Sequence, residues 1–150
     1  MSQSLAQLYV HVTFSTKNRA PSLVADVRPH LFGYLAGVMK NINCPAIEIG
    51  GVADHLHILC RQAKNITAED LIKKIKTPTS QWMKKQGIGF RDFFWQGGYG
   101  IFSVSPSNLS SVRQYILAQE EHHRKETFLD EFRRFLERYE VEYDERYVWD

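Results

Sequence analysis

The 150-residue sequence lacks the features that would place a chain in a membrane or outside the cell. It has no run of eighteen apolar residues, so no transmembrane helix is predicted. Its start, Met1-Ser2-Gln3-Ser4, does not show the charged-then-apolar pattern of a signal peptide. The two cysteines, Cys44 and Cys60, form neither a metal-type spacing nor a disulfide framework. We therefore expect a cytoplasmic protein with reduced thiols.

Repeats, linkers and nucleotide-binding loops are also missing. No internal repeat or low-complexity segment divides the chain, so we expect a single domain over residues 1–150. No glycine-rich stretch has the pattern of a phosphate-binding loop for nucleotides. Gly97-Gly98 is better explained as a hinge or a site of close packing.

Charged residues make up an ordinary 24% of the chain but are unevenly distributed. Residues 1–92 carry 12 Lys or Arg against 6 Asp or Glu, a net charge of +6, and residues 93–150 carry 7 against 11, a net charge of −4. The basic part has candidates for phosphate contacts, namely Lys17, Arg19, Lys73, Lys74, Lys76, Lys84 and Lys85. Such a group suits a polyanion, although a solvated helix face gives the same pattern.

Hydrophobic periodicity predicts four strands and four helices. The strands are expected at residues 5–15, 45–52, 54–60 and 99–104, and the helices at 23–41, 67–85, 107–124 and 127–138. Pro78 should break or kink the second helix at Thr77. This order predicts an α+β fold, in which helices pack on one face of an antiparallel, ferredoxin-like or RRM-like sheet and a late helix carries a tyrosine.

The most informative stretch is Asp54-His55-Leu56-His57-Ile58-Leu59-Cys60. It is apolar and partly β-branched, which predicts a strand. Because side chains alternate across a strand, the two histidines should share one face with Leu59. The other face then carries Leu56, Ile58 and Cys60. Two imidazoles on one strand face form half of a divalent-metal site, although two half-buried histidines on an amphipathic strand have the same spacing.

The helix predicted at residues 107–124 has residue types that could complete such a site. Tyr115 and Gln119 lie four residues apart and so share a helix face. An amide oxygen is a hard ligand that suits Mg²⁺ or Mn²⁺, and Tyr115 would then sit beside the metal. Of the seven tyrosines, only Tyr115 has an amide or a carboxylate four residues later. An ordinary surface pair would have the same spacing.

The combined pattern, His-hydrophobe-His on a strand followed by Tyr-x-x-x-Gln on a late helix, resembles the HUH single-strand DNA transposases with one catalytic tyrosine. This family includes small transposases of bacterial insertion sequences and the REP-associated tyrosine transposases. The resemblance covers about residues 5–135. Further stretches that resemble the family are residues 11–19, 52–57, 95–105 and 121–128.

The resemblance implies a metal-dependent enzyme that cleaves and rejoins single-stranded DNA at hairpins. Tyr115 would be the nucleophile, and a 5′-phosphotyrosine would be the intermediate. The ligands of Mg²⁺ or Mn²⁺ would be His55, His57 and Gln119. The resemblance also implies a homodimer in the bacterial cytoplasm, associated with the nucleoid. Specific DNA-binding residues are not assigned by it.

Several alternatives remain open at this level. The protein could be a domesticated REP-associated enzyme, a hairpin-DNA-binding protein of the same fold without catalysis, or a small metal hydrolase that uses His55 and His57 with another base. His122 is expected on the Tyr115 face as an ordinary surface histidine or as a further site residue, and His123 is expected to point elsewhere. His11 could line the site but more simply packs or faces solvent.

Overall fold

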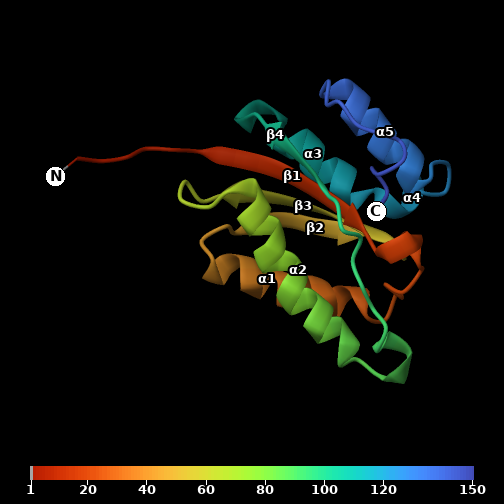
Figure 1. Cartoon of the computed structure of the whole chain (residues 1–150). Coiled ribbons are helices and arrows are strands. Elements are labelled where there is room, and N and C mark those ends of the chain that lie inside the picture. The colour runs from red at the N-terminus through yellow and green to blue at the C-terminus, as the bar shows by residue number, and fades with distance from the viewer. Residues whose placement is uncertain (1) are drawn as a thin grey trace.

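A four-stranded antiparallel sheet forms the centre of the protein in the computed structural model, which describes residues 2–150 (Figure 1). Its strands are β1 (Leu8–Ser15), β2 (Ala46–Gly51), β3 (His55–Gln62) and β4 (Gly100–Val104). Their order across the sheet is β2-β3-β1-β4, with β1 paired to both β3 and β4. This order and the helices between strands make a ferredoxin-like arrangement, so the predicted α+β class is confirmed.

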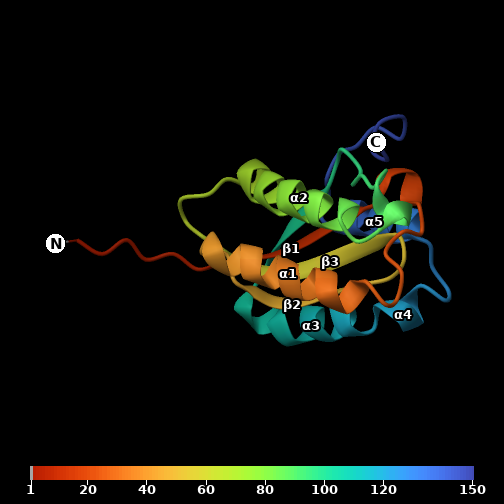
Figure 2. The same cartoon turned by 90° about the horizontal axis from the view of Figure 1, so that it is seen from below.

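Helices lie on both faces of this sheet (Figures 1 and 2). The helices α1 (Arg28–Asn41) and α2 (Ala68–Lys84) pack together on one face, as expected for the helical layer. The structure adds a second layer on the other face, made by α3 (Leu109–Leu117), α4 (Gln119–His122) and α5 (Phe128–Arg138). Short 3₁₀ turns lie at Lys17–Arg19, Ile88–Phe90 and Pro106–Asn108. None of the helices in residues 2–150 is long and apolar enough to cross a membrane.

Alternation along the strands divides the buried side chains between the two faces. Leu56, Ile58 and Cys60 of β3 are fully buried in the core that α1 and α2 cover. Leu59 instead packs with Val104 and with Ile116 of α3. The predicted assignment of the β3 side chains to opposite faces is therefore confirmed. It places His55 and His57 beneath the second helical layer, where both are fully buried.

The predicted break at Pro78 is wrong, because α2 continues through it from Ala68 to Lys84. A proline removes one main-chain hydrogen bond of a helix, but the other turns of α2 remain. The buried stripe of α2, including Ile75 and Met83, holds the helix on the core across the proline. Thr79, next to Pro78, is also buried and donates its hydroxyl to the Ile75 carbonyl at 2.7 Å. Tertiary packing thus outweighs the local helix-breaking preference.

The single helix predicted at residues 107–124 is interrupted at Ala118. This residue has φ −94° and ψ 18°, outside the helical region, and α4 starts directly after it. Close packing accompanies the bend, because a Cβ at Gly50 of β2 would lie only 2.6 Å from the Ile116 carbonyl oxygen. Glycine at this position therefore lets α3 approach the sheet, and the turn at Ala118 then directs Gln119 inward, where it is buried.

Candidate active site

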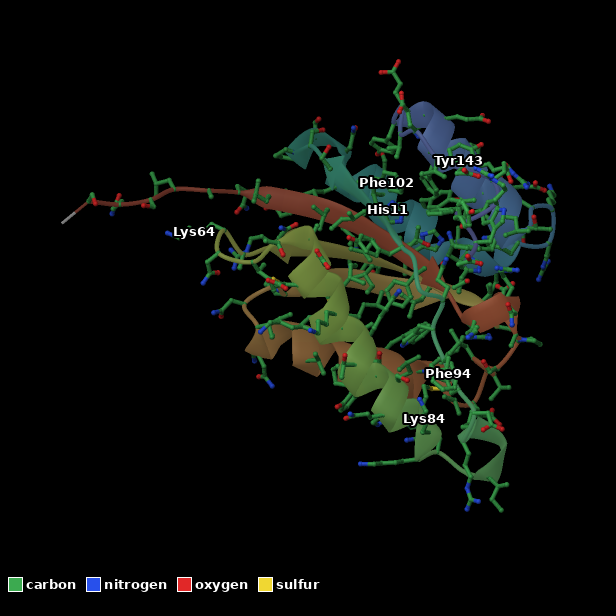
Figure 3. All side chains as sticks on the ribbon, viewed as in Figure 1. His11, Lys64, Lys84, Phe94, Phe102 and Tyr143 are labelled. Carbon is green, nitrogen blue, oxygen red and sulfur yellow. The ribbon has the colours of Figure 1, made fainter. Side chains whose placement is uncertain are left out.

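The four candidate site residues come together in one chain, on the sheet face that α3, α4 and α5 cover. His55 and His57 come from β3, Tyr115 from the C-terminal half of α3, and Gln119 from the start of α4. The His55 Nε2 atom lies 3.2 Å from Gln119 Oε1, and the His57 and Tyr115 ring centres are 5.9 Å apart. His11 of β1 reaches the same cluster from the neighbouring strand, with its Nε2 atom 2.8 Å from His57 Nδ1. Figure 3 labels His11 among the side chains of the molecule.

The carboxylate of Glu131, from α5, occupies the centre of this cluster. Its Oε1 atom lies 2.8 Å from His57 Nε2 and 3.5 Å from His55 Nε2. Its Oε2 atom accepts a hydrogen bond from the Tyr115 hydroxyl. The side chain is only 1% exposed. Burial opposes its charge, but His57 and hydrogen bonds from the surrounding imidazoles outweigh burial and hold the pKa of Glu131 well below its usual range.

His55 is oriented by the residue that precedes it. Its Nδ1 atom lies 2.7 Å from Asp54 Oδ1, so the Nδ1–H donates to that carboxylate and Nε2 points into the cluster. Burial disfavours the imidazolium, but hydrogen bonds to Asp54 and Glu131 outweigh it and raise the pKa of His55 to about 9. A carboxylate on the outer nitrogen of a histidine is the arrangement that orients metal-binding imidazoles in proteins.

His57 is oriented by His11, because its Nδ1 atom lies 2.8 Å from His11 Nε2. With Glu131 accepting from His57 Nε2–H, the His57 Nδ1 atom is an acceptor and His11 is the donor. Burial first, and then the charge that His57 would carry, lowers the pKa of His11 to about 3. Both imidazoles are therefore neutral in this arrangement. Metal binding at His57 Nε2 would require the other tautomer, in which Nε2 loses its proton and Nδ1–H donates to His11 Nε2.

The Tyr115 hydroxyl is held by two residues of α5. Besides the contact to Glu131, it accepts a hydrogen bond of 2.9 Å from Arg134 Nη2. Its ring stacks on His122, with the ring centres 4.5 Å apart. Burial first and the Glu131 charge second raise the pKa of Tyr115 above its usual value, against the opposing effect of Arg134. A neutral phenol held in place therefore needs an acceptor for its proton before it can attack.

His123 also points into the cluster, so the expectation that it points elsewhere is wrong. Its Nε2 atom lies 3.1 Å from Glu131 Oε2, and its ring centre lies 4.2 Å from that of His55. The expectation assumed one straight helix from residue 107 to 124, whereas α4 starts after the bend at Ala118 and ends at His122. The bend changes the direction of every side chain that follows it.

This donor set fits a divalent metal. Ligand atoms of His55, His57, His123 and Glu131 all lie within 4.8 Å of one another. The Gln119 Oε1 atom also faces His55 Nε2. Two imidazoles with outer-nitrogen partners, a carboxylate and an amide oxygen suit Mg²⁺ or Mn²⁺, and the nitrogen donors favour Mn²⁺ of the two. The metal ligands predicted from the sequence, His55, His57 and Gln119, lie around one point with Glu131.

Sequence reasoning missed Glu131, although the sequence contains a signal for it. Residues 128, 132, 135 and 136 form the buried apolar stripe of α5, with helical spacing. Glu131 falls on that stripe, at a position where the pattern requires an apolar side chain. An isolated carboxylate on an apolar face needs charged or hydrogen-bonding partners when buried, so it indicates a polar site. Arg134, missed as well, carries no such signal, because it lies at the edge of the stripe.

One of the candidate phosphate contacts in the basic half has a structural role instead. The Lys76 ammonium donates to the carbonyls of Gln96 and Gly98 at 2.8 and 2.7 Å. Burial lowers the pKa of Lys76 to about 8. Trp82 of α2 likewise packs within the protein, against Tyr34 of α1 with ring centres 5.7 Å apart.

We expect His11 to make the protein sensitive to mild acid. Its pKa of about 3 lies below the unfolded value of 6.5, so the unfolded chain binds the additional proton between these pH values. Stability is therefore fully present above pH 6.5 and falls as the pH drops toward 3. Between pH 7 and pH 5 the loss due to His11 should be about 2 kcal/mol. Urea unfolding at pH 7 and pH 5 measures it.

The His11→Gln variant should lose this part of the pH dependence, because glutamine does not titrate. Its unfolding free energy should drop by about 2 kcal/mol less than that of the wild type between the two pH values. His30→Gln, which changes an exposed histidine of α1, is the matched control. Equal drops in the wild type and His11→Gln would show that the burial of His11 does not govern acid stability.

A protein family and an individual protein to which this chain is similar are both transposases. Residues 4–119 match the model of the family described as IS200-like transposases. The ISDra2 transposase TnpA of Deinococcus radiodurans is 24% identical over 118 residues, which cover 75% of this chain and 84% of that protein. The matched family segment ends at Gln119, so α5 with Glu131 and Arg134 lies beyond it.

Solved structures with low sequence identity share the fold. A crystal structure of a transposase candidate from Deinococcus radiodurans R1 superposes with a TM-score of 0.62 at 20% identity, over 79% of this chain and 98% of that chain. A REP-associated tyrosine transposase bound to a REP hairpin superposes with a TM-score of 0.60 at 14% identity, over 82% of this chain and 74% of that chain.

Proposed function

This chain belongs to the IS200-like transposase family, and we propose that it cleaves and rejoins single-stranded DNA through Tyr115. One observation carries the proposal: a single buried carboxylate, Glu131, contacts both the His55–His57 pair and the Tyr115 hydroxyl. The proposed nucleophile and the proposed metal ligands thus contact one and the same side chain. That proximity is what phosphoryl transfer by an activated hydroxyl requires.

In the proposed reaction the Tyr115 oxygen bonds to the phosphorus of a DNA phosphodiester. The bond from phosphorus to the 3′ oxygen breaks, the phenol gives up its proton, and the departing 3′ oxygen takes one up. The products are a 5′-phosphotyrosine and a free 3′-OH. A second 3′-OH can attack the phosphotyrosine, which reverses the bond changes and rejoins strands without ATP.

Each residue of the cluster has a role in this proposal. His55, His57 and Gln119 would hold a divalent cation, Mg²⁺ or Mn²⁺, with Glu131 as a further ligand. Bound there, the cation would supply positive charge that stabilises the phosphate oxygens as negative charge develops. Asp54 and His11 keep the two imidazoles in orientation from their outer nitrogens. The second carboxylate oxygen of Glu131 gives the phenol proton an acceptor.

Hairpin DNA is the proposed substrate, since the REP-associated tyrosine transposase that shares this fold is bound to a REP hairpin. That likeness also supports the second candidate, a domesticated REP-associated enzyme that acts on chromosomal repeats. A third candidate binds hairpins without cleaving them. The expected homodimer remains part of the proposal, although the site residues named above all come from one chain.

The proposal predicts a covalent protein–DNA adduct. We expect the wild type, mixed with end-labelled single-stranded DNA hairpins and Mn²⁺, to give a labelled band that survives denaturing electrophoresis. EDTA should abolish the band, and peptide mass spectrometry should place the nucleotide on Tyr115. An adduct on another residue would exclude the proposed nucleophile. Hairpin binding without any adduct would favour the non-catalytic candidate.

A further inference from the structure

A pocket of about 260 Å³ lies beside Tyr115, between α3 and α5. Ser111 and Tyr115 of α3 line one side of it, and Arg134 and Arg138 of α5 line the other. Tyr139 and Phe135 add aromatic surface. We refer to these six residues as the Tyr115 pocket. None of the residues that line it is one of the proposed metal ligands, although Tyr115 and His11 contribute to its wall.

The two arginines give the pocket affinity for an anion. Arg134 Nη2 lies 2.9 Å from the Tyr115 hydroxyl, so a phosphate that approaches this hydroxyl must also approach the guanidinium. Nε and Nη2 of Arg134 already donate to Glu126, whereas Nη1 donates to no group in residues 2–150. Arg138, one turn later, forms no ion pair within the same residues. Free guanidinium donors are well suited to phosphate oxygens.

The aromatic side of the pocket suits an unpaired base. The Tyr139 ring stacks on Phe102 with ring centres 4.7 Å apart and planes 22° apart, and Tyr139 is 36% exposed. Phe102 thus supports one face of a ring that remains partly accessible to solvent. Stacking on such a ring is how proteins hold bases of single-stranded DNA. The volume lies just below the range of about 300–1,000 Å³ for small-molecule sites, so it suits one nucleotide rather than a duplex.

We propose that the Tyr115 pocket binds the nucleotide whose 5′-phosphate Tyr115 attacks. This inference rests on the proposed function. Arg134 would hold the phosphate at the tyrosine hydroxyl, Arg138 would contact the next phosphate, and Tyr139 would contact the base. Because this nucleotide remains attached to Tyr115 after cleavage, the pocket would retain the covalent strand until a 3′-OH returns. The arginines lie outside the segment that matches the family model, so they would be a property of this chain's α5.

Equilibrium binding of fluorescein-labelled dT20, followed by anisotropy in EDTA, tests the pocket without any cleavage. Arg138→Ala should weaken binding about five- to tenfold, and should lower the slope of log affinity against log salt by about 0.7. Arg133→Ala removes the same charge from the same helix but from a residue paired with Glu145, so it should change binding less than twofold. If the two variants weaken dT20 binding equally, the proposal is overturned, and the overall positive charge of α5 explains the binding instead.

A second pair of variants tests whether DNA binding needs the open volume of the pocket, rather than its charge. Ser111→Trp should fill the pocket and weaken dT20 binding at least fivefold, whereas Ser110→Trp, on an exposed position of α3 outside the pocket, should not. Unchanged binding of Ser111→Trp would overturn the proposal. The adduct assay on the same wild-type preparation separates the two hypotheses. If the adduct forms but the pocket variants bind dT20 as tightly as the wild type, only the pocket proposal is refuted. If the pocket variants bind dT20 more weakly but no adduct forms, only the proposal of strand cleavage is refuted.

Discussion

Replacing Tyr115 by phenylalanine is expected to lower the rate of strand cleavage by at least about 10³-fold, because the variant has no oxygen to attack the phosphorus. The phenylalanine ring can keep the packing of Tyr115 against His122 and Phe135, so the fold should persist. Binding of the hairpin should change less than threefold, because only the hydroxyl contacts to Glu131 and Arg134 are lost. Labelled-adduct formation and anisotropy measure the two quantities on the same preparation.

Tyr34→Phe is the matched control for this experiment. Tyr34 lies on α1, on the opposite side of the sheet, and its ring packs on Trp82. Cleavage by this variant should be within twofold of the wild type. If Tyr115→Phe still cuts hairpin DNA at a comparable rate, the phosphotyrosine mechanism is wrong, and the small metal hydrolase with another nucleophile becomes the better hypothesis.

Glu131→Gln is expected to have the second large effect, on metal binding and on stability. The variant keeps the shape of the side chain but loses the charge at the centre of the imidazole cluster. Loss of a carboxylate ligand should weaken Mn²⁺ binding about 10- to 100-fold, by analogy with the loss of residues that hydrogen-bond to metal ligands and orient them. Titration calorimetry, or the loss of the free Mn²⁺ signal in electron paramagnetic resonance, measures this affinity without DNA.

The metal-free Glu131→Gln variant should also be less stable at pH 7, by about 3 kcal/mol, because a buried charge pair loses one partner. The pH dependence of stability identifies the charged groups responsible for this loss. The pKa of His55 is raised to about 9, so its contribution is present below pH 6.5 and lost as the pH rises to 9. The pKa of Glu131 is lowered, so its contribution is present above about pH 4.5 and lost as the pH falls through its folded value.

The difference in stability between wild type and Glu131→Gln should therefore shrink from pH 6.5 toward pH 9. Urea unfolding across this range, with EDTA present, measures it. Glu137→Gln, at an exposed position on the same helix, should change stability by less than 0.5 kcal/mol, as is usual for surface positions. A Glu131→Gln variant that binds Mn²⁺ as tightly as the wild type would exclude Glu131 from the ligand set.

Local patterns in the sequence were enough for most of the fold. The alternation along residues 54–60 correctly assigned the side chains of β3 to two faces, because the period of a strand is a property of the backbone alone. The order of strands and helices was enough for the α+β class. Local patterns failed where packing competed with them. Helix α2 continues through Pro78, and the chain bends at Ala118 inside a pattern that looked uniformly helical.

The sequence by itself determined which residue types could form a site: His55 and His57 on one strand face, with Tyr115 and Gln119 four residues apart. It did not show that Tyr115 and Gln119 lie on separate helices, α3 and α4. The tertiary structure alone decided that Glu131, about 75 residues after the histidine pair, lies between them and the tyrosine. The reason is physical. Spacing along a helix or strand follows from backbone geometry, whereas the meeting of distant segments depends on how the apolar faces of α3 and α5 pack on the sheet.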